Sequence, residues 1–390
     1  AGVMITVLFY SWLQGALSMI LQTTAHFSTG HLRVMSRAYA QEADQIPNDL
    51  ALIGIDMLLT ELRKDYPELH WTPRIKFGGL LDIPDENRET RVQGPVVGTA
   101  ANLLSPDSPE WQILNIESAI VRGRVPQQAG EILISDEFAR KLNVRPGETA
   151  TLIGSTMYGS MATASFTIAG TVRFGVAAMD KGAMIADVSD VQAALDMQNA
   201  AGEILGFFAD DIYHNDRAEA ITAAFNAHYE NVDDELAPVM GTLRSESGLA
   251  DYLDMAGAFS GIIVGIFVVA MSIVLWNAGL MGSLRRYGEI GVRLAIGEEK
   301  GHIYRAMLGE SLIIGLAGSA LGTLAGVAIA YYLQVHGIDI SAMMKNVTMM
   351  ISNVMRAQVT PTSYVIGFIP GILATLLGTS IDGIGIYKRQ

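Results

Sequence analysis

Charged side chains gather in one short loop between two long apolar runs of the sequence. Within this loop Glu289 and Arg293 lie four residues apart, a spacing that on a helix gives an ion pair worth about 0.3–0.5 kcal/mol. Such groups suit docking to a partner more than bond-making chemistry. Basic residues beside apolar runs also mark the cytoplasmic side of a membrane. The loop is therefore either a topology determinant alone or a docking site as well. Its basic residues are Arg285, Arg286, Arg293, Lys300 and Arg305.

Residue patterns for catalysis or metal binding are missing from the sequence. It contains no Gly-x-x-x-x-Gly-Lys-Ser/Thr motif to hold nucleotide phosphates, no His-Glu-x-x-His motif and no Gly-x-Ser-x-Gly motif. The 7 histidines are scattered, and there is no cysteine for a disulfide or a thiolate metal site. We therefore expect a chain that is not an enzyme and has no catalytic residue, metal site or cofactor of its own.

The charges divide the chain into an acidic segment and an apolar remainder. Residues 28–254 hold 34 of the 40 acidic residues and 17 of the 26 basic ones, which leaves that segment at −17 and the rest at +3. A nucleic-acid partner is excluded, because phosphate binding needs a basic face. Hydrophobic residues make up 50% of the chain and charged residues only 17%, as expected for a membrane protein with a large water-facing part.

Four segments are long and apolar enough to cross a bilayer, which takes about 20 residues. The basic loop (284–305) should lie inside, so residues 28–254 and the loop 334–360 should lie outside, and the chain end in segment 361–390 inside. The first segment lacks the basic start of a signal peptide, and we expect residues to be missing before Ala1. The predicted membrane helices are Gly2–Phe27 (within 1–27), Met255–Ser283, Ala306–Leu333 and Tyr364–Ile381.

The residue pattern of the outer segment (28–254) predicts a folded α+β domain. We expect its flanks, Arg33–Ala43 and Glu246–Tyr252, to prolong the membrane helices as a stalk. Helices are expected at Leu50–Lys64, Asp136–Leu142, Val188–Asn199 and Arg217–Tyr229. Strands are expected at Ile113–Ile116, Glu131–Ile134, Ala150–Ile153, Phe166–Val172 and Gly182–Ile185. The predicted fold class is a membrane protein with four transmembrane α-helices and a large α+β extracytoplasmic domain between helices 1 and 2.

Two sets of residues in the predicted membrane helices could serve contacts. Glycine at every fourth position lets helix backbones approach closely, either within this chain or between two subunits. The uncharged outer halves of the first and second helices offer a substrate cleft for acyl chains, or they simply pack together. The packing glycines are Gly257, Gly261, Gly265, Gly318 and Gly322. The cleft residues are Leu17, Ile20, Leu21, Phe27, Phe259 and Ile263.

The loop and the outer segment together resemble a known family. The loop resembles the cytoplasmic signature of the FtsX/MacB-type ABC transporter permeases. The outer segment resembles the periplasmic core domain of that family, and Thr29–Val34 resembles its lipoprotein-releasing branch. The matching loop positions are Arg286, Glu289, Ile290, Gly291, Arg293, Ala295 and Gly297. The matching outer pieces are Gly123-Arg124, Glu131–Ile134, Pro146-Gly147 and Phe166–Gly170.

The resemblance implies a function that the bare residues allow. It implies a permease subunit of the bacterial inner membrane, which extracts or exports a lipoprotein or lipid-like substrate. Its partners would be an ABC ATPase dimer that binds ATP and Mg²⁺, a second permease subunit, the same or related, and a periplasmic acceptor. The alternatives are a MacB-like tripartite efflux permease and a mechanical relay that regulates a periplasmic partner without transport. The implied ATPase-coupling residues are Arg286, Glu289, Ile290, Gly291, Arg293 and Gly297.

Overall fold

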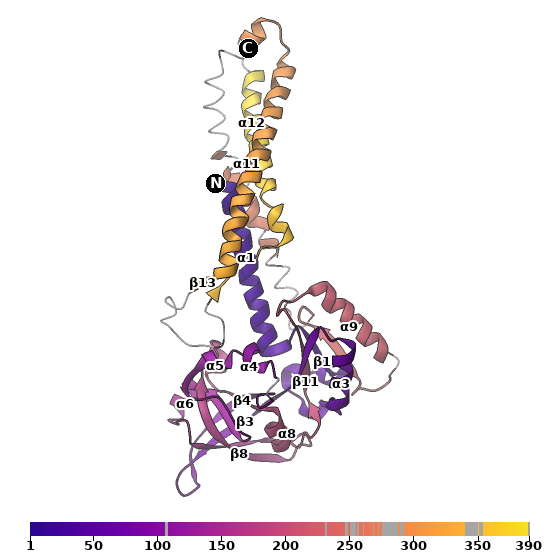
Figure 1. The fold of residues 1–390 in the computed structure, drawn as a ribbon, viewed down its shortest axis with the longest axis vertical. Helices are drawn as coiled ribbons and strands as arrows, with labels where there is room; N and C mark the ends of the chain where they lie inside the picture. Colours follow the sequence, from indigo (N-terminus) through magenta and orange to yellow (C-terminus); the bar gives the residue numbers. More distant parts are fainter. Residues whose placement is uncertain are drawn as a thin grey trace. The chain divides into compact units, whose positions relative to one another are not determined.

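The computed structural model divides the chain into two compact units (Figure 1). The helical unit comprises Ala1–Met19, Asp251–Ile340 and Val354–Gln390, and the α+β unit comprises Ile20–Ala250 and Ser341–Asn353. The residues that the structure describes are 1–105, 108–230, 232–245, 249, 255, 257–259, 261–267, 269–271, 273, 274, 288, 292–339, 350 and 354–388.

Long apolar helices dominate the helical unit. They are α1 (Gly2–Thr24), whose last residues belong to the α+β unit, α11 (Lys300–His336) and α12 (Phe368–Lys388). Each lies in a stretch apolar and long enough to span a membrane, so three of the four expected membrane helices are found. A shorter apolar helix covers Gly257–Met271, within the expected second helix, and residues 275–283 of that helix lie outside the described part of the chain.

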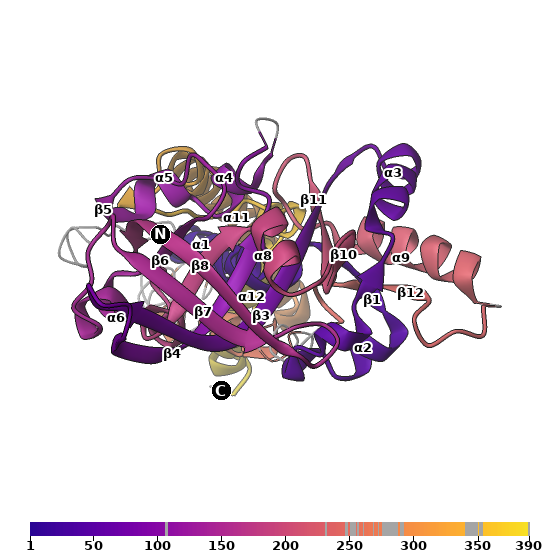
Figure 2. The same ribbon diagram turned by 90° about the horizontal axis from the view of Figure 1, so that it is seen from below.

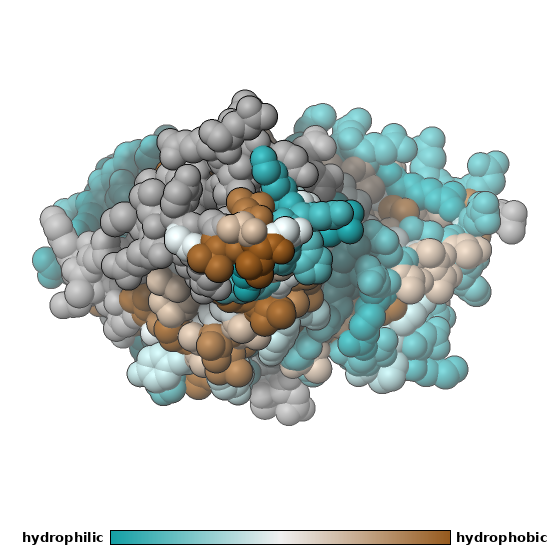
Figure 3. Space-filling model, turned by 90° about the horizontal axis from the view of Figure 1, so that it is seen from above, coloured by the Kyte–Doolittle hydropathy of each residue, from teal (hydrophilic) through white to brown (hydrophobic). Residues whose placement is uncertain are grey.

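The surface of the helical unit is apolar. Side chains on α11 such as Ile313, Leu321 and Leu324 are 69–72% exposed. In Figure 3 brown, hydrophobic residues gather on the helices, whereas the described surface of the α+β unit is mostly teal. Soluble proteins rarely expose a continuous apolar surface of this kind, and lipid tails suit it. Short elements complete the unit: β13 (Ile338–Asp339) pairs with β14 (Val354–Met355), and η4 (Pro361–Tyr364) precedes α12.

The α+β unit is built on a ten-stranded mixed sheet with the strand order β12-β1-β11-β3-β4-β9-β6-β8-β5; β7 pairs with β3 and β8. Two further strands, β2 (Leu52–Ile53) and β10 (Ala200–Ala201), form a separate ladder. The strands of the main sheet are β1 (Leu32–Ser36), β3 (Leu69–Pro84), β4 (Thr90–Ala101), β5 (Ile120–Gly123), β6 (Glu131–Ser135), β7 (Thr149–Ser155), β8 (Met161–Val172), β9 (Ala183–Asp187), β11 (Glu203–Phe208) and β12 (Pro238–Thr242).

Strand β3 joins the two halves of this sheet. Its first part pairs with β11 up to Arg74, which lies opposite Glu203, and its second part pairs with β4 from Ile75 onward. Figure 2 shows β3 running between the half that contains β4, β6 and β8 and the half that contains β1, β11 and β12. Arg74 and Ile75 therefore lie at the joint where one half of the sheet passes into the other.

Short helices cover the sheet, and polar caps fix where several of them begin. Ser36, Ser135 and Asp187 each accept a hydrogen bond from a main-chain N–H of the helix that follows. The helices are α2 (Arg37–Gln41), α3 (Ile55–Asp65), α4 (Glu110–Ile113), α5 (Ile116–Ala119), α6 (Asp136–Lys141), α7 (Ala177–Asp180), α8 (Val188–Ala194) and α9 (Asn215–Tyr229). Single turns occur at η1 (Ala25–Thr29), a π-helical turn directly after α1, η2 (Ala43–Gln45) and η3 (Asn48–Leu50).

Apolar side chains form two clusters in this unit. The larger lies under α3, α8 and α9 and includes Phe77 and Phe138. The smaller contains Phe174 and, from the loop before α12, Met350, which is 4% exposed. The Met350 N–H donates to the carbonyl of Arg173 at 2.9 Å. The loop that follows β13 therefore contributes at least one residue to the core of the α+β unit.

The expected strands at residues 131–134, 150–153, 166–172 and 182–185 are confirmed as β6 to β9. The expected strand Ile113–Ile116 is wrong: the segment contains the end of α4 and the start of α5, separated by Leu114 and by Asn115, which has φ +48°. The stalk at Arg33–Ala43 is also wrong, because the buried strand β1 ends at Ser36, which caps α2. The other flank, Glu246–Tyr252, falls almost wholly outside the described residues.

Candidate functional site

The predicted ATPase-coupling loop is described only at its C-terminal end. Arg293 is exposed on a helical turn at residues 292–295, and Gly297 follows two residues after its end. Gly297 has φ +94°, a left-handed conformation that glycine adopts without strain, and the N–H of Glu298 closes the turn on the carbonyl of Arg293 at 3.1 Å. The other four predicted residues, Arg286, Glu289, Ile290 and Gly291, lie outside the described residues, and the docking role of the loop stays a prediction.

The predicted substrate cleft is distributed over both units. Leu17, Leu21 and Ile263 are half-buried, and Ile20 and Phe259 are 38% and 58% exposed. Their role in substrate binding stays a prediction. Phe27 has different surroundings from the other five: its ring centroid lies 6.4 Å from that of Phe174, and it packs on the smaller apolar cluster of the α+β unit. Its role in substrate binding likewise stays a prediction.

The glycines predicted for helix packing fall into two groups. A Cβ atom added to Gly322 would lie 2.8 Å from the Cβ of Val3, so α1 and α11 approach closely at this point. Added to Gly318, Gly257, Gly261 or Gly265, a Cβ atom would meet no described atom within 4 Å. The face formed by the last three glycines is therefore open within the described part of the chain.

An apolar cavity of about 460 Å³ lies among the helices of the helical unit. Its lining includes Gly2 and Ile5 of α1, Met271, and Ile314 and Gly318 of α11. Nearby, the rings of Phe9 and Phe267 lie 6.1 Å apart, which places the helical segment around 267 beside α1. The cavity is near the N-terminal end of α1, whereas the cleft was predicted near the opposite end of that helix.

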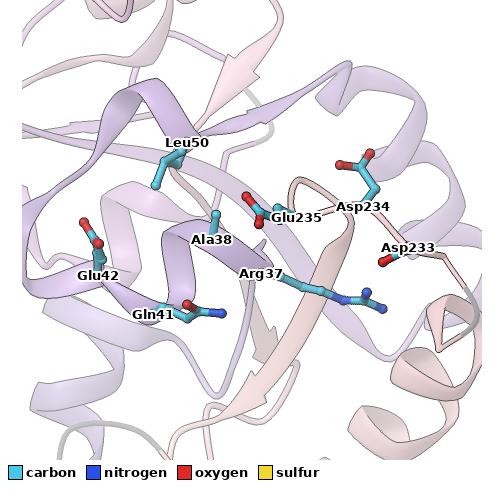
Figure 4. A pocket seen from close by; sticks show the side chains of 8 residues that line it. All are labelled: Arg37, Ala38, Gln41, Glu42, Leu50, Asp233, Asp234 and Glu235. Carbon is cyan, nitrogen blue, oxygen red and sulfur yellow. The ribbon is translucent and has the colours of Figure 1, made fainter.

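A polar pocket of about 320 Å³ lies between α2 and the loop before β12. In Figure 4 Arg37 extends from α2 toward this loop, which carries Asp233, Asp234 and Glu235. The Arg37 guanidinium donates to the main-chain carbonyls of Tyr229 and Val232, so its donors already serve the fold. Carboxylates alone do not define a cation site, and among the described residues no three metal-ligating side chains converge. We assign no ligand to this pocket.

The sequence analysis did not predict a buried ionic cluster that lies at the turn η1, between α1 and strand β1 of the sheet. Arg74 and Glu110 are both 0% exposed; Nε of Arg74 donates to Oε1 of Glu110 at 3.1 Å and Nη2 to Oε2 at 2.7 Å. The third donor, Nη1, reaches the carbonyl of His26 in the turn η1 at 2.5 Å. Buried cations are rare unless paired. The signal that could have pointed to this site is the pair of cations Arg74 and Lys76 at alternate positions beside Ile75 and Phe77.

A second cation holds the same turn two residues further along β3. Nζ of Lys76 donates to the carbonyl of Ser28 at 3.1 Å and to Oε1 of Glu203 at 2.9 Å. Glu203, 1% exposed, also accepts from Arg33 at 3.2 Å. The last carbonyls of a helix have no partner within the helix, and cations near them are favourable. Arg74, Lys76, Glu110 and Glu203 therefore clamp the turn after α1 to the sheet, and we call these four residues the turn clamp.

Histidines and aspartates surround the other side of this turn. His26 contacts Asp211 (Nε2 to Oδ1, 2.8 Å), and His214 contacts Asp210 in the same loop (2.7 Å). His31, 1% exposed, stacks on Phe208. Burial lowers the pKa of His31 from 6.5 to about 4, against the opposing charge of Asp211. His31 is therefore neutral at pH 7.

Comparison with known proteins identifies the C-terminal part most clearly. Residues 261–390 match the FtsX-like permease C-terminal family. The lipoprotein-releasing system transmembrane proteins LolC of Xylella fastidiosa strains 9a5c and Temecula1 are 22% identical over 249 residues, 56% of this chain. The chain spans 57% of the length of these relatives.

A solved structure with a similar region is the periplasmic region of MacB from Actinobacillus actinomycetemcomitans. It is 12% identical, with a TM-score of 0.37, and the match covers 55% of this chain and 89% of that one. The family match at residues 261–390 and the similarity to LolC confirm the resemblance read from the sequence. Residues 261–390 are thus those of an FtsX-like permease, and the chain resembles the FtsX/MacB-type permeases of ABC transporters.

Proposed function

We propose that this chain is a permease subunit that turns the motion of a partner ATPase into motion of its α+β unit. It would thereby extract or export a lipoprotein or lipid-like substrate from the bacterial inner membrane. The observation that carries the proposal is the continuity of α1 with the α+β unit. The turn η1 after α1 is held by the turn clamp, and Ala25, Thr29 and His31 in and beside it are 0–1% exposed. A displacement of α1 would therefore act directly on the sheet.

The proposed topology has four membrane helices. It adds the second helix, around Met255–Ser283, to the three apolar helices found, and places residues 28–254 and 334–360 in the periplasm. The basic residues of 284–305 support a cytoplasmic position for that loop. The domain boundaries predicted from the sequence remain part of this proposal.

The proposed partners meet the chain at two places. The ATPase, which would bind ATP and Mg²⁺ as its own cofactors, would seat the loop that contains Arg286, Glu289, Ile290, Gly291, Arg293 and Gly297. A second permease, the same or related, would pack on the face formed by Gly257, Gly261 and Gly265. Support for the second contact comes from the open space around these glycines within the described residues.

The proposed substrate class rests on apolar surface and on one relative. Leu17, Ile20, Leu21, Phe259 and Ile263 carry no charge, and each methylene of an acyl chain that they bury would contribute about 0.8 kcal/mol. The relative LolC is described as part of a lipoprotein-releasing system, and we extend this activity to the present chain as a proposal.

Site-specific crosslinking tests the substrate class. Photo-crosslinkers at Leu17 and Phe259, in the chain assembled with its ATPase, should capture a lipid-bearing protein or a lipid. The control position is Tyr158, 77% exposed at the β7–β8 turn. Capture of soluble proteins at Tyr158, with only a neighbouring permease at Leu17 and Phe259, would favour the relay or the efflux permease instead.

A further inference from the structure

The turn clamp joins three parts of the molecule at one point. Its two cations lie at alternate positions of β3, on either side of Ile75, where β3 changes its pairing from β11 to β4. Through Glu110 the clamp reaches α4, and through Glu203 it reaches β11. The turn after α1 is thus attached at the joint between the two halves of the sheet.

The two cations of the turn clamp donate to main-chain carbonyl groups of the turn. A side-chain substitution in the turn cannot remove these acceptors. Arg74 donates to the carbonyl of His26, and Lys76 donates to the carbonyl of Ser28. Hydrogen bonds to charged donors are directional and roughly twice as strong as neutral ones. Two such bonds, two residues apart, fix both the position and the rotation of the turn.

Stability alone does not require charges at this place. Burying an ion pair costs desolvation energy, and apolar residues of similar volume often stabilise a fold as well or better. A neighbouring apolar side chain of β3, Phe77, already packs in the larger cluster. Apolar packing cannot provide a directional hydrogen bond to a main-chain carbonyl.

We propose that Arg74 and Lys76 are positioning residues that transmit movement of α1 to the joint of the sheet. This inference rests on the proposed function. When α1 tilts or slides, the two cations carry the turn and β3 with it, and both halves of the sheet change their orientation together. Without these hydrogen bonds, movement of α1 is no longer transmitted to the α+β unit, and ATP hydrolysis continues without substrate movement.

Lys76 offers the cleanest test, because its removal leaves no buried charge unpaired. In Lys76→Met the carboxylate of Glu203 keeps Arg33 as its partner at 3.2 Å. Lys76→Arg keeps a cation and serves as the rescue variant. Arg91→Met, which removes the more exposed Arg91–Glu148 pair, is the matched control for loss of an ion pair elsewhere in the unit.

The measurement is the number of substrate molecules released per ATP hydrolysed, in proteoliposomes with the partner ATPase, alongside the melting temperature of each variant. Lys76→Met should keep its ATPase rate and melting temperature but lower the ratio at least about 5-fold, whereas Lys76→Arg and Arg91→Met should keep the wild-type ratio. An unchanged ratio in Lys76→Met would overturn the inference, as would loss of ratio and melting temperature together in both Lys76 variants. If the wild-type chain itself released nothing, the proposed function would fail instead.

Discussion

Arg74 and Glu110 form a fully buried, two-point ion pair between strand β3 and helix α4. The pair is completed by Thr72, whose hydroxyl donates to Oε1 of Glu110 at 3.0 Å. The remaining donor of the guanidinium is directed at the main chain of the turn after α1. Each charge is thus neutralised inside the protein, and both side chains are 0% exposed.

Removing one partner of this pair should destabilise the α+β unit strongly. Arg74→Met strands the Glu110 carboxylate and should cost about 3–5 kcal/mol. The double variant Arg74→Met/Glu110→Leu removes both charges and should recover most of that loss. Thermal unfolding of the full chain in detergent, followed by tryptophan fluorescence, measures the difference. Equal melting temperatures for the two variants would show that the pair is not energetically coupled.

The folded α+β unit should become less stable as the pH decreases, over a window set by the pKa of His31. Its pKa is lowered from 6.5 to about 4. Between these values the unfolded chain binds more protons than the folded one, so stability is complete above pH 6.5 and is lost as pH falls toward 4. The full loss is about 3 kcal/mol, at 1.36 kcal/mol per pKa unit. Nδ1 accepts from the N–H of Phe208 at 3.0 Å, and protonation there would break this bond.

The comparison variant for His31 is His31→Asn, which keeps an acceptor near Nδ1 but does not titrate. The charged and titratable groups around His31 are His26, Asp210, Asp211 and His214, and they remain in both proteins. Melting temperatures measured from pH 7.5 to 4.5 should fall more steeply for the wild type, by several degrees in total. Parallel curves would rule out His31 as the source of the pH dependence.

Two glycines on α11 should respond oppositely to the same substitution. Gly322→Ala places a methyl group 2.8 Å from the Cβ of Val3 and should destabilise the helical unit by about 1–3 kcal/mol through overpacking. Gly318→Ala meets no described atom within 4 Å and should be neutral or mildly stabilising, since alanine favours helix. The temperature at which the detergent-purified protein aggregates measures the change in stability for both variants. A more stable Gly322→Ala protein would show that α1 and α11 do not pack as observed.

Single cysteines test the topology cleanly, because the chain contains none. Ser245→Cys should react with a membrane-impermeant maleimide in intact spheroplasts, and Gly301→Cys should react only after permeabilisation. The basis is the basic bias of the loop 284–305. The reverse labelling pattern would place the ATPase and the α+β unit on the wrong sides for the proposed mechanism.

The sequence predicted the helical unit better than the sheet. Apolar length alone identified α1, α11 and α12, because a membrane helix needs about 20 uncharged residues. Strands β3 and β4, of 16 and 12 residues, went unrecognised because glycines and prolines interrupt their alternation. Gly98 is needed there: an added Cβ would lie 2.0 Å from the Phe77 ring. Only the folded pairing of β3 with β4 makes this requirement visible.

The candidate site was predictable to an even smaller extent. The loop residues stood out because basic side chains cluster between two long apolar runs, and Gly297 has the left-handed conformation that its type allows. The turn clamp depends on contacts between residues 36 to 127 positions apart, such as Arg74 with Glu110 and Lys76 with Glu203. No local pattern specifies which carboxylate will meet which cation across a sheet.

The most direct test of the proposed function is the coupling of ATP hydrolysis to substrate release. The chain, reconstituted in proteoliposomes with its partner ATPase, is compared with Arg293→Glu, which reverses an exposed charge in the loop. We predict that the wild type releases a lipid-anchored substrate only with ATP. Arg293→Glu should still hydrolyse ATP but release at least about 10-fold less substrate per ATP, because a reversed charge in a seated loop meets like charge. Equal release per ATP by both proteins, or no ATP-dependent release by the wild type, would contradict the account.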